Sequence, residues 1–176
     1  AGFTHWAKLN NLKQAAKTMN FLTEHGISSY GELESKLNAV SARRDTAHAE
    51  IKRIESRSAE LALVMKHAGT YRQLKPLYDR YRKSNDKEKF LRGHESEIIL
   101  FEAAARELKR LGAVPLPTTE SMKTELANLS AEKERLLAEY KTARTEAQEY
   151  ETVKQNVDAL LAVPKEQEQQ RRHELE

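Results

Sequence analysis

The sequence predicts an all-α protein: a long antiparallel coiled-coil hairpin with a small helical tip and an N-terminal helix packed at the base. Few turns are possible, because the 176 residues include only 6 glycines and 4 prolines. Two segments repeat apolar residues with the 4,3 spacing that is typical of coiled coils. No segment carries the sustained apolar–polar alternation of a half-buried strand. These observations favour long helices over a fold that contains a sheet.

An N-terminal helix is expected within residues 1–26. Its apolar residues recur at steps of three and four and form one stripe: Phe3, Trp6, Leu9, Leu12, Ala16, Met19 and Leu22. Gly26 is expected to end this helix as a left-handed cap. Because an apolar stripe needs a partner, we expect Trp6, Leu9 and Leu12 to pack at the open end of the hairpin. The nearest partners there would be Leu33 and either Val157 or Leu161.

The first coiled-coil arm is expected over residues 29–68. Ser29 and Glu32 have the spacing of a capping box, which marks the start of a helix. Eight of the ten seam positions that follow are apolar: the seam is Leu33, Leu37, Val40, Arg44, Ala47, Ile51, Ile54, Ser58, Leu61 and Met65. We expect Gly69 to end this arm, since glycine is a poor helix former.

The second arm is expected over residues 118–163. Thr118 or Thr119 offers an N-cap, and Pro164 is expected to end the helix. The polar residues 164–176 that follow are expected to form either a tail or a frayed helical extension. Ten of its twelve seam positions are apolar: the seam is Met122, Leu126, Leu129, Lys133, Leu136, Tyr140, Ala143, Ala147, Tyr150, Lys154, Val157 and Leu161.

The two seams are expected to pair with each other within one chain. Their polar members Arg44, Ser58, Lys133 and Lys154 would help to fix the register. Pairing between two chains, which would make a homodimer, is the alternative that the sequence leaves open.

The tip is expected over residues 69–117 and should contain three short helical pieces. Their order is a helix over 70–83 kinked near Pro76, a break with a cap over 84–86, a short helix over 87–92 broken by Gly93, and a helix over 95–111 capped by Gly112.

Several classes of function are disfavoured by the sequence. The chain has no cysteine, and its six histidines are not spaced as metal ligands on one helix. Phosphate-binding loops, dinucleotide fingerprints and nucleophile elbows are absent from the sequence. The longest uncharged apolar runs, at residues 61–65 and 159–163, have only five residues each and are too short to cross a bilayer. We therefore expect no catalytic residue, no metal, no cofactor and no membrane partner.

The basic charge is concentrated in the tip. Residues 66–92 hold nine Lys and Arg against three acids, a net charge of +6, whereas residues 118–163 hold six against nine. Basic residues interleaved with aromatic residues suit nucleic acid, because cations neutralise phosphates and rings stack on unpaired bases. The candidate nucleic-acid-binding residues are Lys75, Tyr78, Arg80, Tyr81, Arg82, Lys83, Lys87 and Lys89. The alternative is a solvated helix whose tyrosines pack inward.

Four stretches of the sequence resemble one protein family. They are WAKLNNLKQAAKTMNFLTEHGI (6–27), YRQLKPLYDRYRKS (71–84), KFLRGHESEIILFEAA (89–104) and LPTTESMKTEL (116–126). The stretches are similar to the segment that follows the nuclease domain in relaxases, the mobilisation proteins of conjugative transposons and plasmids of Gram-positive gut bacteria. The resemblance covers roughly residues 6–161, and the absence of an initiator Met fits an excised piece of a longer protein.

The resemblance implies a non-catalytic C-terminal domain in a bacterial cytoplasmic enzyme. The tyrosine nucleophile and the metal-binding histidines of relaxases belong to their N-terminal domain, and no matching histidine cluster occurs in this chain. Such a domain would contact transfer-origin DNA during plasmid or transposon mobilisation. A different class of function is also open, namely a coiled-coil module that dimerises or recruits other relaxosome or coupling proteins.

Overall fold

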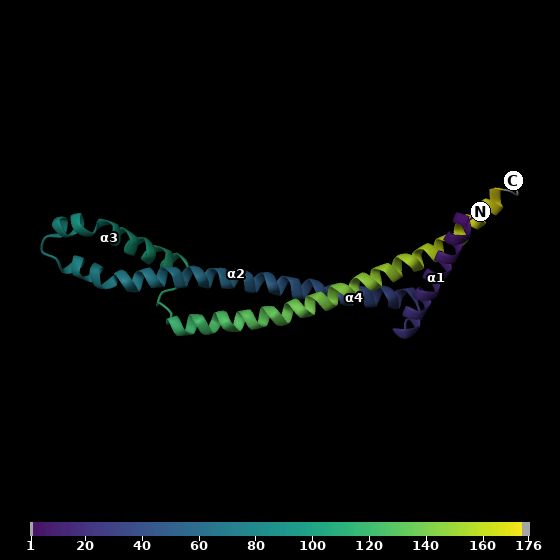
Figure 1. The fold of residues 1–176 in the computed structure, drawn as a ribbon, viewed down its shortest axis with the longest axis horizontal. Coiled ribbons are helices and arrows are strands. Elements are labelled where there is room, and N and C mark those ends of the chain that lie inside the picture. Colours follow the sequence, from purple (N-terminus) through teal and green to yellow (C-terminus); the bar gives the residue numbers. More distant parts are fainter. Residues whose placement is uncertain (1, 174–176) are drawn as a thin grey trace. The chain divides into compact units, whose positions relative to one another are not determined.

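The computed structural model describes the backbone of residues 2–173 and the side chains of residues 10–162 (Figure 1). This part of the chain forms four helices and no strand: α1 (Gly2–Glu24), α2 (Tyr30–Lys83), α3 (Lys87–Arg110) and α4 (Thr119–His173). The all-α prediction is confirmed. The helices divide between two compact units, and α2 and α4 contribute to both. The first unit holds residues up to 48 and from 137 on, and the second holds residues 49–136.

Most of the helix ends form where the sequence predicts them. Gly26 and Gly112 take positive φ angles of 61° and 67°. The next amide after each glycine donates back into the preceding helix, from Ile27 N to Leu22 O and from Ala113 N to Leu108 O. Three side chains cap helix starts by accepting from a backbone amide, namely Ser29 from Glu32 N, Asp86 from Lys89 N and Thr118 from Ser121 N.

The two predicted seams form the contact between α2 and α4. All ten positions of the first seam are buried or half-buried, and so are eleven of the twelve in the second. The exception is Leu161, which is exposed. In the first unit, Leu33 packs with Tyr150 and Val153. The second unit has its own core, formed by Leu61, Val64, Ala68, Leu108, Ala113 and Met122.

Ion pairs confirm that the two arms run antiparallel within one chain. In the first unit, Arg44 lies 3.8 Å from Glu151, and Lys154 lies 3.9 Å from Glu34. In the second unit, Lys133 lies 2.8 Å from Glu55 and Arg57 lies 2.7 Å from Glu125. In each unit, residues later in α2 pair with residues earlier in α4. The polar seam residues Arg44, Lys133 and Lys154 all make such cross-arm contacts, so their charge helps to select this register.

The prediction that Gly69 ends the first arm is wrong, because α2 continues to Lys83 through both Gly69 and Pro76. A glycine inside a helix costs only about 1 kcal/mol relative to alanine, and proline costs about 3 kcal/mol. Side chains on both sides of Gly69 are held by tertiary packing that offsets these costs. Ala68 is fully buried in the core of the second unit, and the ring of Tyr71 stacks on Phe101 of α3.

The expected stop at Pro164 is also wrong, since α4 extends to His173. Proline in a helix interior removes one backbone hydrogen bond but does not prevent the following residues from taking helical angles. The polar segment that follows Pro164 is therefore helical as far as residue 173. In α3, by contrast, the expected break is confirmed. His94, next to Gly93, has the non-helical angles φ −141° and ψ 25° inside an otherwise helical run.

The N-terminal helix docks on α4, but through a different face from the one expected. Leu12 is 71% exposed, while the polar residue Thr18 is only 2% exposed. Thr18 Oγ1 accepts a hydrogen bond from Asn156 Nδ2 at 3.1 Å, and the Phe21 ring packs edge-on against Tyr150 at 5.1 Å. Leu12 and Met19, two members of the predicted apolar stripe, are exposed, so the prediction for Leu12 is wrong.

The side chains of Trp6 and Leu9 lie outside the described residues. At the inner end of α1, Leu22 packs against the Ile27, Leu33, Tyr150 and Val153 cluster. The helix therefore does contact the region near Leu33, as the sequence suggests, but through its last two turns.

A polar contact fixes the start of α2 on α4. The Tyr30 hydroxyl donates to Asp158 Oδ1 at 2.6 Å, and Lys154 Nζ lies 3.1 Å from Asp158 Oδ2. The hydrogen bond from Tyr30 and then that from Lys154 hold the pKa of Asp158 below its usual value. A lowered pKa in the folded state means that this carboxylate stabilises the fold above its ordinary pKa. The contribution is lost as the pH falls through the lowered value.

Replacing Tyr30 with phenylalanine should raise the pKa of Asp158 toward the ordinary value of about 3.9. The reason is that the variant removes the hydroxyl that favours the charged carboxylate. An NMR pH titration of the side-chain carboxyl carbons measures this pKa directly. Tyr71→Phe, which changes a tyrosine of the second unit, is the control and should leave the pKa of Asp158 unchanged. An Asp158 pKa that is the same in both variants would contradict the assigned contact.

Candidate nucleic-acid interface

The predicted binding residues gather at one end of the second unit, where α2 turns into α3. Figure 1 shows α3 lying alongside the last turns of α2, and the connection between them spans only residues 84–86. Six residues of the predicted set belong to the end of α2, and Lys87 and Lys89 belong to the first turn of α3. The turn therefore brings together two groups of cations that the sequence separates by a break.

Most of the predicted cations are exposed and have no acidic partner among the described residues. They are Arg80, Arg82, Lys83, Lys87 and Lys89. Lys75 is different, because its ammonium lies 2.9 Å from a carboxylate oxygen of Asp79 on the next turn of α2. That contact raises the pKa of Lys75. Lys75 is thus the member of the set whose charge is compensated locally.

The acids near the turn do little to neutralise these cations. Asp86 is the N-cap of α3, and its carboxylate accepts from the backbone N–H of Lys89 at 3.0 Å. Asp79 is paired with Lys75, and Glu88 forms no ion pair in the part of the chain that the structure describes. The surface of the turn consequently keeps an excess of positive charge.

Aromatic rings form a continuous chain from the core of the second unit to the turn. Phe101 of α3 stacks on Tyr71 and Tyr78 of α2, with ring centroids 4.8 Å and 4.2 Å apart. Tyr81 follows at 5.9 Å from Tyr78 and 6.0 Å from Phe90, and Phe90 lies 4.9 Å from His94. The inner end of this chain is buried at Phe101, whereas Tyr81, Phe90 and His94 are half-buried.

The position of Tyr78 bears on its predicted role. One side of its ring faces Phe101, and its hydroxyl lies 3.4 Å from Glu102 Oε1. Burial and then the charge of Glu102 raise the pKa of Tyr78, so the phenol stays neutral and can donate to that carboxylate. Tyr78 therefore helps to hold α2 against α3, and Tyr81 lies nearer to the turn.

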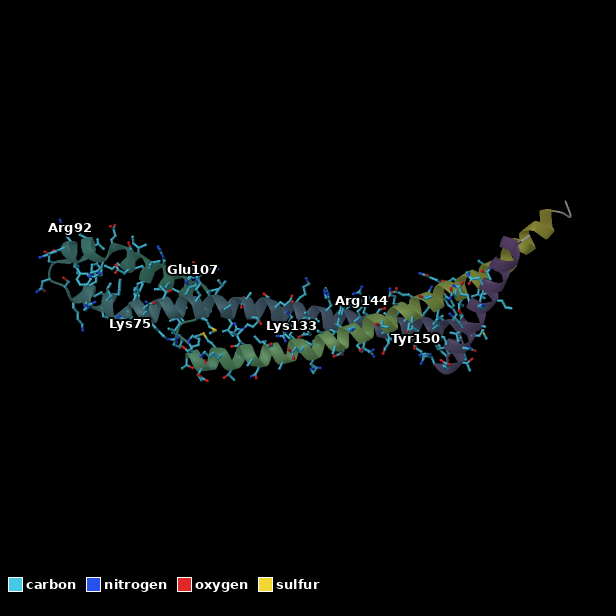
Figure 2. All side chains as sticks on the ribbon, viewed as in Figure 1. Lys75, Arg92, Glu107, Lys133, Arg144 and Tyr150 are labelled. Carbon is cyan, nitrogen blue, oxygen red and sulfur yellow. The ribbon has the colours of Figure 1, made fainter. Side chains whose placement is uncertain are left out.

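Sequence reasoning missed three residues of this region. Arg92 is exposed, and Figure 2 shows it on α3 near the turn, beyond Lys75 along the second unit. Phe90 and His94 end the aromatic chain beside the same turn. Their spacing of four residues would place both on one face of an unbroken helix, but the non-helical angles of His94 interrupt α3 directly after Gly93. The spacing alone therefore does not predict that the two rings lie together.

A groove in the first unit lies between α1 and α4 and has a volume of about 850 Å³. Three of its polar side chains bond to one another across the two helices. Gln14 Nε2 donates to Asn156 Oδ1 at 2.8 Å, and Asn156 in turn donates to Thr18. These three side chains therefore help to hold α1 on α4.

The described residues offer neither a candidate metal site nor a candidate membrane span. They contain no group of three or more His, Cys, Asp or Glu side chains placed to hold a metal ion. In the same part of the chain, no helix is both long enough and apolar enough to span a membrane. No protein-family model, curated protein or solved structure matches the chain. The turn between α2 and α3 is accordingly the candidate functional surface of the described residues.

Proposed function

We propose that the chain is a non-catalytic C-terminal domain of a conjugative relaxase, and that the turn between α2 and α3 contacts transfer-origin DNA during mobilisation in the bacterial cytoplasm. One observation supports the proposed DNA contact. Six exposed cations without an acidic partner among the described residues surround the turn: Arg80, Arg82, Lys83, Lys87, Lys89 and Arg92. Residues 80–92 contain only two acids, Asp86 and Glu88, so the local excess is six minus two, or +4.

The net positive charge at the turn differs from the positive charge along the seam, which is paired. There, Arg44, Arg57, Lys133 and Lys154 lie against acids of the opposite arm, so the mixed charge serves the pairing of the helices. Unpaired cations on an exposed turn repel one another and stabilise nothing in the chain itself. An anionic partner removes that repulsion, and the phosphate backbone of nucleic acid is a partner with a high density of negative charge.

A fluorescence anisotropy titration tests the proposal. The chain is added at low ionic strength to labelled oligonucleotides of mixed sequence, both single-stranded and duplex. We expect saturable binding, since phosphate neutralisation does not depend on sequence. Absence of affinity for both probes at low salt would contradict the proposed DNA contact.

A second candidate function, a docking or dimerising coiled coil, is favoured by the outward face of α1. Leu12 and Met19 are one heptad apart on this helix, and both are largely exposed. Exposed apolar residues at this spacing form a face that another helix could cover. A mass that rises with concentration in analytical ultracentrifugation, and that returns to the monomer value in the Leu12→Ser/Met19→Ser double variant, would support self-association through this face.

A further inference from the structure

A small pocket lies beside the turn between α2 and α3. Its volume is about 280 Å³, and it is lined by Ser84, Asp86, Lys89, Phe90, Gly93 and His94. The pocket spans the break in α3, because the non-helical angles of His94 follow directly after Gly93. A side chain at position 93 would not be strained by its surroundings, since a Cβ built there meets no atom within 4 Å.

Two aromatic rings contribute to the wall of this pocket. Phe90 and His94 have ring centroids 4.9 Å apart and a tilt of 39° between their planes, so they do not stack flat on each other. Both residues are only half-buried. A flat aromatic guest could therefore pack against them, as unpaired bases do in proteins that bind single strands.

The side of the pocket formed by Asp86 is less suited to a phosphate than the side formed by Lys89. The Asp86 carboxylate already accepts from the backbone N–H of Lys89 at 3.0 Å, so the start of α3 is capped by a negative group of the chain itself. Ser84 and Asp86 also bond to each other across the turn, at 3.1 Å and 3.2 Å. A carboxylate at the wall repels a phosphate, but it can accept a hydrogen bond from the N–H groups at the edge of a base.

Cationic residues flank the pocket-lining residues in the sequence. Lys83 precedes Ser84, Lys87 follows Asp86, and Arg92 precedes Gly93; all three are exposed and have no acidic partner among the described residues. From this placement we propose that the pocket receives one unpaired base of single-stranded DNA, while these cations hold the neighbouring phosphates. This inference rests on the proposed DNA contact and adds a preference for single strands, because the bases of a duplex are stacked and paired.

Variants of the pocket test the inference in the full chain. Phe90→Ala and His94→Ala each remove a ring, and we expect either to weaken binding of a single-stranded oligonucleotide by about 5- to 150-fold. Binding of a duplex should not change, since the cations remain. Gly93→Leu keeps both rings and adds bulk at the pocket wall, so it should weaken single-strand binding in the same way. His67→Ala is the matched control, because it removes a histidine of the second unit away from the pocket.

The outcomes separate this inference from the proposed function. If the wild-type chain prefers the single strand and the pocket variants lose that preference, the inference is supported. Equal affinity of the wild-type chain for single strand and duplex, unaffected by His94→Ala and Gly93→Leu, would overturn the pocket and leave the DNA contact standing. Failure to bind either probe would overturn both. Thermal unfolding identifies any variant that does not fold. The single-strand affinities of the remaining pocket variants then decide whether the pocket receives a base.

Discussion

Replacing Phe101 with alanine should destabilise the chain by about 3–5 kcal/mol, the usual cost of removing a buried aromatic side chain. Phe101 is only 6% exposed, and its ring joins α3 to α2 by stacking on both Tyr71 and Tyr78. The alanine variant loses both ring contacts and leaves a cavity between the helices. Urea unfolding followed by circular dichroism gives the change in unfolding free energy.

The matched control for Phe101→Ala is the neighbouring residue on the same helix. Leu100 is 55% exposed, so Leu100→Ala should change the unfolding free energy by no more than about 0.5 kcal/mol. Similar losses for the two variants would mean that the ring contacts at Phe101 contribute little to holding α3 on α2.

Reversing three cations at the end of α2, as Arg80→Glu/Arg82→Glu/Lys83→Glu, should abolish DNA binding without a large loss of stability. The three side chains are exposed and have no acidic partner in the described part of the chain, so the fold does not depend on their charge. Each reversal removes an attraction to phosphate and adds a repulsion. Affinity is measured by the anisotropy titration, and stability by thermal unfolding.

A second triple variant separates a local effect from one of net charge. Lys52→Glu/Lys123→Glu/Lys141→Glu also changes three exposed cations. Each reversal changes the charge by two, so both variants take the net charge from +3 to −3. Loss of binding in the first variant alone is the expected result. Equal losses in both would show that binding follows the overall charge of the chain and not the turn between α2 and α3.

The arms of the hairpin could be predicted from the sequence because a heptad repeat indicates both that a segment is helical and which of its faces is buried. Seam residues such as Leu33, Ile54 and Met122 are fully buried, and the polar residues Arg44 and Lys133 find acids across the seam. Helix ends were predictable wherever a residue type has one strong local role, as Gly112 does at positive φ.

Where the prediction failed, tertiary contacts outweighed local preference. Gly69 and Pro76 disfavour a helix by a few kcal/mol together, but α3 packs on α2 and offsets that cost. On α1, the face that packs on α4 is set by the hydrogen bond of Thr18 and the ring contact of Phe21. The pattern of apolar residues in the sequence does not reveal this face.

At the turn between α2 and α3, the sequence predicted the cations but not their surroundings. Charge counts identify Arg80 or Lys87 as basic, but only coordinates show that Lys75 is paired with Asp79 and that Asp86 serves as a cap. The pocket with Phe90 and His94 depends on the break at Gly93, which sets the direction of two helical pieces. Such a direction is a property of the folded chain that no local pattern encodes.

The salt dependence of DNA affinity tests the central claim most directly. Each phosphate neutralised by a cation contributes about −0.7 for a single strand, or −0.9 for a duplex, to the slope of log affinity against log salt. If Arg80, Arg82 and Lys83 each contact a phosphate, replacing all three with alanine should make the slope shallower by about 2–3 units. An unchanged slope in that variant, or no binding by the wild-type chain at low salt, would contradict the claim.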